Sequence, residues 1–186
     1  MSQGTQETEI KLAVKDARSA RRLLREAGFV VSRPRVFEAN TLFDTPELSL
    51  RTSSRILRIR QAGRVATMTY KGAPETGKHK SREELELEIG SAAAMMSIVE
   101  RLCYHRVFRY EKYRTEFRQP RRAGIAMLDE TPVGVYLELE GTPHWIDRTA
   151  RHLGFRESDY NTASYGRLYL AWCAAQGRQP GDMTFQ

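Results

Sequence analysis

Hydrophobic and polar residues alternate strictly along several segments of this chain, beginning with residues 7–14. Successive side chains of a β-strand point to opposite sides, so Glu7, Glu9 and Lys11 fall on one face and the apolar residues between them on the other. The apolar face must be buried. For this strand alone an ordinary solvated face is the better interpretation of the charged side, and only the later segments change that preference.

The same alternation returns in later segments, each time with the charged side chains on one face of the expected strand. It covers residues 55–60, 82–89, 107–117 and 133–140, and the run 65–71 ends in Lys71. Solvated faces usually mix neutral polar and charged side chains. Here the polar positions are mostly carboxylates on some strands and cations on others, and three Glu-x-Glu pairs are among them. This pattern favours a charged face that lines an interior.

Turn signals divide the chain into eight expected strands and four longer expected helices. The strands are expected at residues 5–14, 35–44, 54–61, 64–71, 82–89, 106–118, 124–130 and 133–140, and the helices at 17–27, 91–102, 145–153 and 161–175. Hairpin connections and polar interiors favour a closed antiparallel barrel over an open sheet. The predicted fold class is therefore α+β: an eight-stranded closed barrel with a charged lumen and helices packed outside. In the second helix, Met95, Ile98, Val99 and Leu102 are expected to point inward.

The length and composition of the chain indicate its domain organisation and its cellular compartment. The 186 residues, 40% hydrophobic and 28% charged, fit a single globular domain over residues 1–175 with a flexible tail at 176–186. Cys103 and Cys173 lack metal-ligand spacing and form no disulfide framework, which favours a cytoplasmic protein. No apolar run approaches the roughly 20 residues of a membrane span.

The net charge of +7 invites a nucleic-acid interpretation. Carboxylates interleaved with the basic residues would repel a phosphate backbone, so nucleic acid is not expected as the main partner. A cationic cavity for a small, multiply charged anion explains the surplus as well.

The Glu-x-Glu pairs have a chemical use in such a cavity. Side chains two positions apart on a strand are roughly 6–7 Å apart at their bases, so two carboxylates can converge on one divalent cation. Arginine and lysine across the same space suit phosphate oxygens, arginine through its planar fork. Together they predict a site for a metal-bound polyphosphate.

The order of these motifs closely resembles the CYTH domain, also called the triphosphate tunnel metalloenzyme family, over residues 5–172. The matching motifs are Glu7-x-Glu9-x-Lys11, Phe43-Asp44-Thr45, Leu57-Arg58-x-Arg60, Lys71-Gly72, Arg82-x-Glu84-x-Glu86, Lys112-x-Arg114, and Asp129 followed by Glu138-x-Glu140. The resemblance implies a tunnel that holds a triphosphate and one or two Mg²⁺ or Mn²⁺ ions.

Carried over position by position, the resemblance implies three groups of site residues. The metal ligands would be Glu7, Glu9, Asp129, Glu138 and Glu140; the phosphate-binding residues Lys11, Arg58, Arg60, Lys71, Arg82, Lys112 and Arg114; and Glu84 and Glu86 would position water or a second metal. Lys11, Arg58, Arg60, Glu84 and Glu86 are the expected catalytic set. Asp44 is expected to cap a turn rather than bind metal. Some members of the family close one tunnel mouth with a lysine of the last helix, and here Arg167 stands in that region. Residues 78–80 form either a lid over the phosphates or a solvated loop, and we favour the loop.

The leading functional hypothesis is a metal-dependent hydrolase that cleaves the terminal phosphate of an inorganic or organic triphosphate, since no Ser, Cys or His nucleophile stands out. The alternative is a class IV adenylate cyclase that converts ATP to cyclic AMP and pyrophosphate, for which Phe37, Phe43 and Tyr136 are candidate stacking residues. Tripolyphosphate, ATP, thiamine triphosphate and long-chain polyphosphate stay open as ligands, as do a non-enzymatic binding module and a homodimer. No membrane partner is expected.

Overall fold

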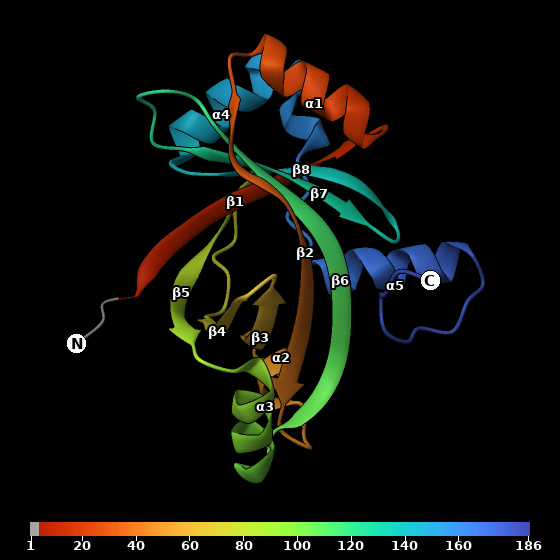
Figure 1. The fold of residues 1–186 in the computed structure, drawn as a ribbon. Coiled ribbons are helices and arrows are strands. Elements are labelled where there is room, and N and C mark those ends of the chain that lie inside the picture. Colours follow the sequence, from red (N-terminus) through yellow and green to blue (C-terminus); the bar gives the residue numbers. More distant parts are fainter. Residues whose placement is uncertain (1–3) are drawn as a thin grey trace.

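The computed structural model describes residues 4–186 and folds them around one closed antiparallel barrel (Figure 1). Around the barrel the strands follow the order β1-β5-β4-β3-β2-β6-β7-β8, with β8 pairing back to β1. The strands are β1 (Thr5–Val14), β2 (Val30–Asp44), β3 (Ile56–Ala62), β4 (Val65–Lys71), β5 (Lys80–Ile89), β6 (His105–Arg118), β7 (Ile125–Thr131) and β8 (Gly134–Glu140). The helices are α1 (Ala17–Glu26), α2 (Ser49–Thr52), α3 (Ala92–Arg101), α4 (Pro143–His152) and α5 (Tyr165–Ala175), with a 3-10 turn at Glu157–Asp159. This architecture confirms the predicted fold class.

The apolar side chains of β1, β7 and β8 point outward and are covered by α1 and α4, which lie together over one side of the barrel (Figure 1). Leu12 and Leu137 from the strands meet Leu24 of α1 and Ile146 of α4, and all four side chains are fully buried. Burying a side chain of this size stabilises the fold by roughly 1.5–3 kcal/mol. The barrel is thus held from outside, which leaves its lumen free for charge.

A second apolar layer joins α3 to the outer face of β3, β4 and β2. Phe43, Ile59 and Val99 are buried there. The prediction that Ile98 and Leu102 point inward is wrong, because they are 50% and 66% exposed. Ile98 lies about 100° around the helix from Val99, which packs against the sheet, and Leu102 is the C-cap residue beyond the last residue of the helix.

Two predicted boundaries move for identifiable reasons. Strand β2 begins at Val30 rather than residue 35, since its first residues pair with the end of β6. Helix α5 begins at Tyr165 rather than residue 161, because the side chain of Ser164 caps it. Asn161 instead forms a two-residue bridge with Lys11, with N–H···O distances of 2.8 and 2.9 Å.

Asp44 caps the turn after β2, as predicted. Its two carboxylate oxygens accept backbone hydrogen bonds from Thr45, Leu50 and Arg51, each 2.8 Å long. These bonds account for its near-complete burial and leave the side chain committed to the turn.

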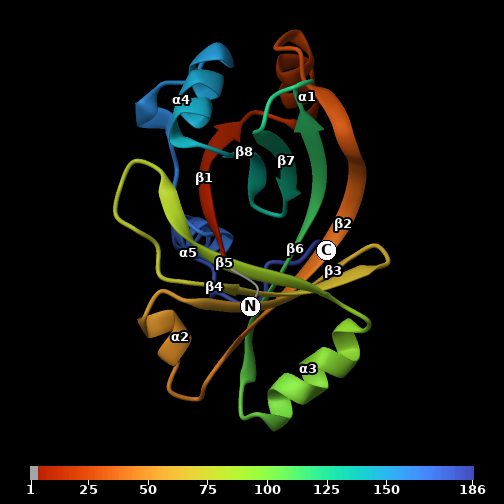
Figure 2. The same ribbon diagram turned by 90° about the vertical axis from the view of Figure 1, so that its left-hand side faces the viewer.

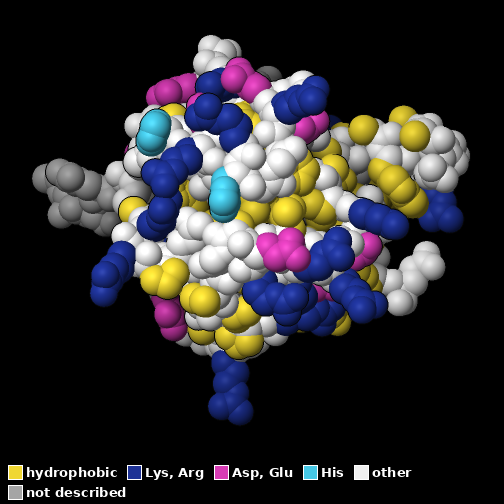
Figure 3. Space-filling model, turned by 90° about the horizontal axis from the view of Figure 1, so that it is seen from above, with side chains coloured by type: hydrophobic (Ala, Val, Ile, Leu, Met, Phe, Trp, Pro, Cys, Tyr) yellow, Lys and Arg dark blue, Asp and Glu magenta, His cyan; other side chains and the backbone are white. Residues whose placement is uncertain are grey.

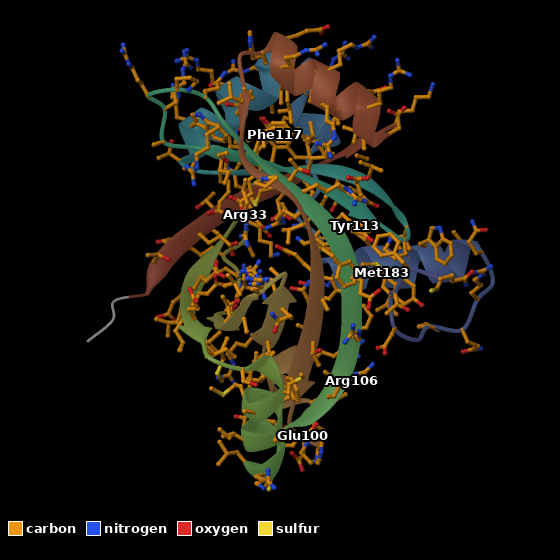
Figure 4. The ribbon with its side chains drawn as sticks, in the orientation of Figure 1. Arg33, Glu100, Arg106, Tyr113, Phe117 and Met183 are labelled. Atoms are coloured by element: carbon orange, nitrogen blue, oxygen red, sulfur yellow. The ribbon has the colours of Figure 1, made fainter. Side chains whose placement is uncertain are left out.

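Part of the segment expected to be a flexible tail packs on the barrel. Met183 is 1% exposed, lies between β6 and α5 (Figure 4), and contacts Tyr110 and Tyr165. Its backbone N–H donates to Arg109 and its carbonyl accepts from Glu111, both at 2.9 Å. The C-terminal residues therefore cover the stretch of β6 that β7 leaves unpaired.

The face that carries α1 and α4 shows many Lys and Arg side chains dispersed among polar and apolar ones, with fewer acidic side chains (Figure 3). Within residues 4–186, no helix combines the length and the apolar character needed to cross a membrane.

Candidate active site

The lumen of the barrel encloses a cavity of about 440 Å³. Figure 2 looks into the ring of strands, with α5 behind it. Every predicted site residue except Asp129 lines this cavity. The lining cations are Lys11, Arg33, Arg58, Arg60, Lys71, Lys80, Arg82, Lys112, Arg114 and Arg118, and the lining carboxylates are Glu7, Glu9, Glu84, Glu86, Glu116, Glu138 and Glu140. When Glu38 and Asp129, which are buried beside the lining, are included, the positive and negative side chains at the lumen nearly balance in number. Most of the net charge of +7 therefore comes from residues outside the lumen.

Strands β1 and β8 bring the predicted carboxylate ligands together. Their register sets Glu9 opposite Glu140 and Lys11 opposite Glu138. The Lys11 ammonium lies 3.1 Å from a carboxylate oxygen of both Glu9 and Glu138. On the other side, Glu7 accepts from Lys71 at 2.6 Å. Each of these carboxylates is therefore neutralised by a lysine in this structure.

Glu140 differs from its neighbours, because no hydrogen bond or ion pair to its side chain occurs within residues 4–186. Burial, together with the charges of Glu7 and Glu138, raises its pKa to about 7. Placing a carboxylate beside others without a cation costs free energy, and a divalent ion would remove that cost. The oxygen-only donor set of Glu7, Glu9, Glu138 and Glu140 thus fits Mg²⁺ or Mn²⁺. No three acidic, His or Cys side chains of the described residues converge into a ready metal site, however, because the lysines hold them apart.

Asp129 lies behind the lining and organises the opposite wall. It accepts from Arg114 at 2.6 and 2.7 Å, from Lys112 at 2.8 Å and from the Tyr165 hydroxyl at 2.6 Å. Burial would raise the pKa of Asp129, yet Arg114 and Lys112 outweigh it and hold the pKa at about 2. Its predicted role as a metal ligand stays a prediction. In this structure all its contacts orient two cations and a tyrosine.

The arginine pair of β3 is held by carboxylates of β5. Glu86 accepts from Arg58 at 3.2 Å and from Arg60 at 2.8 Å, and Thr69 donates to the same oxygen at 2.7 Å. Glu84 lies 3.2 Å from Lys71. Both guanidinium groups thus point into the lumen with fixed orientation.

Several charged residues at the lumen escaped the sequence prediction. The cavity is also lined by Arg33, Lys80, Glu116 and Arg118, and Glu38 lies buried beside it. Glu38 on β2 lies 3.7 Å from both Lys112 and Arg60, and these cations, with Arg114, overcome its burial and hold its pKa at about 2. Lys80 opens β5 with its ammonium 2.7 Å from Glu9. Burial lowers the pKa of Lys80 to about 8, since the cations Lys11 and Arg82 oppose the help that it receives from Glu9. The sequence did contain a signal for Lys80, because it lies two positions before Arg82 and so falls on the same face of a strand. The interpretation of residues 78–80 as a solvated loop is wrong for Lys80.

The end of the cavity nearest α5 is lined by Ser164, Tyr165 and Gly166. Arg167, the candidate plug, is exposed and does not line the cavity. Tyr165 occupies the expected place, with its ring centroid 5.2 Å from the Lys11 ammonium and 4.9 Å from that of Lys112. A tyrosine rather than a basic side chain therefore closes this end.

None of the predicted stacking residues lines the cavity. Phe43 is buried in the outer apolar layer, and Phe37 packs on Tyr113 outside the barrel with ring centroids 5.3 Å apart. Tyr136 packs edge-on against Tyr165. The aromatic rings that do line the lumen, within residues 4–186, are Tyr110 and Tyr165.

A smaller cavity of about 320 Å³ shares Arg33, Arg60 and Glu86 with the first. Glu88, the last carboxylate of the β5 row, lines only this space. The lumen therefore continues past the arginine pair, beside β3 and β4.

Comparison with known proteins agrees with this geometry. A Methanocaldococcus jannaschii protein named a putative adenylate cyclase is 28% identical over 134 residues, which cover 72% of this chain and 75% of that protein. The structure of a putative adenylate cyclase from Vibrio parahaemolyticus aligns with a TM-score of 0.76 at 20% identity, covering 89% of this chain and 98% of that one. A Hippeastrum protein, described as a putative adenylyl cyclase with a dominant triphosphatase activity, aligns with a TM-score of 0.62 at 20% identity, covering 94% and 97%.

The two structural alignments share the fold at low identity, and the family assignment rests on a separate match. A family model described as the CYTH domain covers residues 5–156, well over half of the chain. The protein belongs to the CYTH domain family.

Proposed function

We propose that this protein is a metal-dependent triphosphatase that removes the terminal phosphate of a triphosphate bound in the barrel lumen. One observation carries the proposal: buried cations and buried carboxylates line a single cavity in the barrel lumen. Buried charges are costly unless they are paired or serve a ligand. A triphosphate with a divalent ion would give each set a partner of opposite charge.

The residues that would hold the ion are Glu7, Glu9, Glu138 and Glu140, of which the Glu140 side chain has no hydrogen-bond or ion-pair partner among residues 4–186. A bound Mg²⁺ or Mn²⁺ supplies Lewis-acid polarisation of phosphate oxygens. When these carboxylates are so engaged, Lys11 loses its present partners and Lys71 keeps only Glu84, so both can turn to phosphate oxygens.

The remaining chemistry falls to side chains that already point into the lumen. Phosphoryl transfer needs mainly positioning and charge stabilisation, so it requires no covalent nucleophile. Arg58 and Arg60 on one wall, and Lys112 and Arg114 on the other, would spread the charge of the phosphate chain. Glu84, whose pKa burial raises, is suited to accept a proton from an attacking water.

The alternative, a class IV adenylate cyclase, is favoured by the names of the three aligned proteins and by the rings of Tyr110 and Tyr165 in the lining. Both rings are already engaged: Tyr165 bonds to Asp129, and Tyr110 packs against Phe108 and Tyr165. They offer little free surface to a base. We therefore place hydrolysis first, in line with the activity stated for the Hippeastrum protein.

Product analysis tests the proposal. The protein is incubated with Mg²⁺ or Mn²⁺ and, separately, tripolyphosphate, ATP or thiamine triphosphate, and orthophosphate, pyrophosphate and cyclic AMP are separated and quantified. Orthophosphate without cyclic AMP is expected. Cyclic AMP with equimolar pyrophosphate from ATP would replace hydrolysis by cyclisation.

Matched variants tie the activity to the lumen. Glu9→Gln and Glu84→Gln each remove one inward carboxylate and are expected to lower kcat/KM at least tenfold. Glu83→Gln makes the same change one position away, on the exposed face of β5, and should leave kcat/KM within twofold. Equal losses in Glu83→Gln and Glu84→Gln would show that the lumen is not the reaction site.

A further inference from the structure

Lys80 is a buried lumen cation with one acidic partner. Its ammonium lies 2.7 Å from Glu9, on the same carboxylate oxygen that Lys11 contacts at 3.1 Å. Lys11 has Glu138 as a second partner, whereas Lys80 has no other ion pair within the described residues. Two ammonium groups on one oxygen leave a surplus positive charge that faces the cavity.

The residue before Lys80 is fixed on the outside of the barrel. His79 lies 2.7 Å from Asp147 of α4, and only 10% of its side chain is exposed. The same carboxylate accepts from the hydroxyl of Tyr160 at 3.2 Å and pairs with Lys78 at 3.0 Å. Asp147 therefore connects the loop before β5 to α4 and to the segment after it.

This connection is placed so that it can orient Lys80. His79 directly precedes the first residue of β5, so its contact with α4 fixes the backbone from which Lys80 enters the strand and points inward. Ser81, the next outward residue, is held by Thr8 at 2.6 Å. Lys80 is thus flanked by two outward anchors, of which Asp147 is the one that acts from outside the sheet.

We propose that Lys80 binds a phosphate oxygen of the substrate, and that Asp147 is a positioning residue that holds Lys80 in the lumen through His79. The inference rests on the proposed function, because it assumes a triphosphate in the cavity. When Glu9 engages a divalent ion, the Lys80 ammonium loses its partner at a point where the phosphate chain would pass. The loop of residues 72–79 then acts as a fixed support for Lys80.

Equilibrium binding of tripolyphosphate, measured by titration calorimetry with and without Mg²⁺, tests this inference independently of turnover. Lys80→Met is expected to raise the Kd by about tenfold or more, as for loss of a charge-assisted hydrogen bond. Asp147→Ala should raise it at least threefold, while Asp147→Asn, which keeps an oxygen acceptor for His79, should recover most of the affinity. Lys15→Met, a change at an exposed lysine, should leave the Kd unchanged.

A double variant separates positioning from general damage. If Asp147 acts through Lys80, then Lys80→Met with Asp147→Ala binds no more weakly than Lys80→Met alone. His79→Ala removes the same contact from the loop side and leaves α4 intact, so it should match Asp147→Ala.

The possible failures are distinguishable. Unchanged affinity in Lys80→Met, with wild-type hydrolysis intact, overturns the role of Lys80 and leaves the proposed function standing. Additive losses in the double variant overturn the positioning role of Asp147. A wild-type protein that neither binds nor hydrolyses a triphosphate rejects the proposed function, and the inference with it.

Discussion

Replacing Glu140 with glutamine should stabilise the metal-free protein at alkaline pH. Burial and the nearby charges of Glu7 and Glu138 raise the pKa of Glu140 to about 7, against an ordinary value of 4.5. Between these two values the folded protein keeps a proton that the unfolded chain has lost, so stability falls as the pH rises through that window. Below pH 4.5 both states are protonated, and the penalty is absent.

The magnitude follows from the two pKa values. At about 1.4 kcal/mol for each tenfold change in proton affinity, the interval corresponds to a penalty of roughly 3 kcal/mol above pH 7. Glutamine has the shape of the protonated acid and carries no charge, so Glu140→Gln should regain most of that free energy at pH 8. For a chain of this length, each kcal/mol shifts the Tm by about 2–4 °C, which gives an increase of roughly 5–10 °C.

The assay is urea unfolding in the presence of a chelator, at pH 4.5 and pH 8. The free-energy difference between Glu140→Gln and wild type should be near zero at the lower pH and favour the variant at the higher one. Glu100→Gln, on the exposed surface of α3, is the matched control and should show little change at either pH. A variant that is equally or less stable than wild type at pH 8 would refute the account of Glu140 as an uncompensated carboxylate.

Three further changes have expected outcomes, each measured by urea unfolding. Tyr165→Phe removes the buried hydroxyl that donates to Asp129 at 2.6 Å and should lower the free energy of unfolding by about 1.5–3 kcal/mol; a loss under roughly 0.5 kcal/mol would mean that the surrounding cations satisfy Asp129 alone. Gly124→Ala would place a Cβ 2.2 Å from the Trp145 ring and should cost about 1–3 kcal/mol by overpacking, whereas Gly90→Ala, with open space around it, should cost far less. Asp44→Ala leaves the backbone N–H groups that it caps without acceptors and should cost about 1–2 kcal/mol; an unchanged midpoint would show that water replaces them.

Strand periodicity was sufficient to predict the closed barrel and its inward charge. Glu9 points into the lumen because it alternates with Ile10 and Leu12, whose side chains pack on the outer face beneath α1 and α4. The same rule places Glu84 inside and Glu83 outside.

The periodicity of a single strand does not predict which side chains meet across neighbouring strands. Glu38 lies buried beside the lumen opposite Lys112, a relation set by the register of β2 and β6, which periodicity within one strand does not specify. Asp129 was placed correctly on its strand, but its partners come from β6 and α5. Lys80 was assigned to a Gly- and Pro-rich loop, although it falls on the same face as Arg82, because the start of β5 is set by the pairing of Lys80 with Glu9 of β1.

The central claim is that the lumen holds a metal-bound triphosphate, and a crystal structure with tripolyphosphate and Mn²⁺ tests it most directly. The account predicts a phosphate chain between Arg58 and Arg60 on one wall and Lys112 and Arg114 on the other. An anomalous Mn²⁺ signal is expected within coordination distance of Glu140. Phosphate density on the outer surface with an empty lumen would contradict the claim.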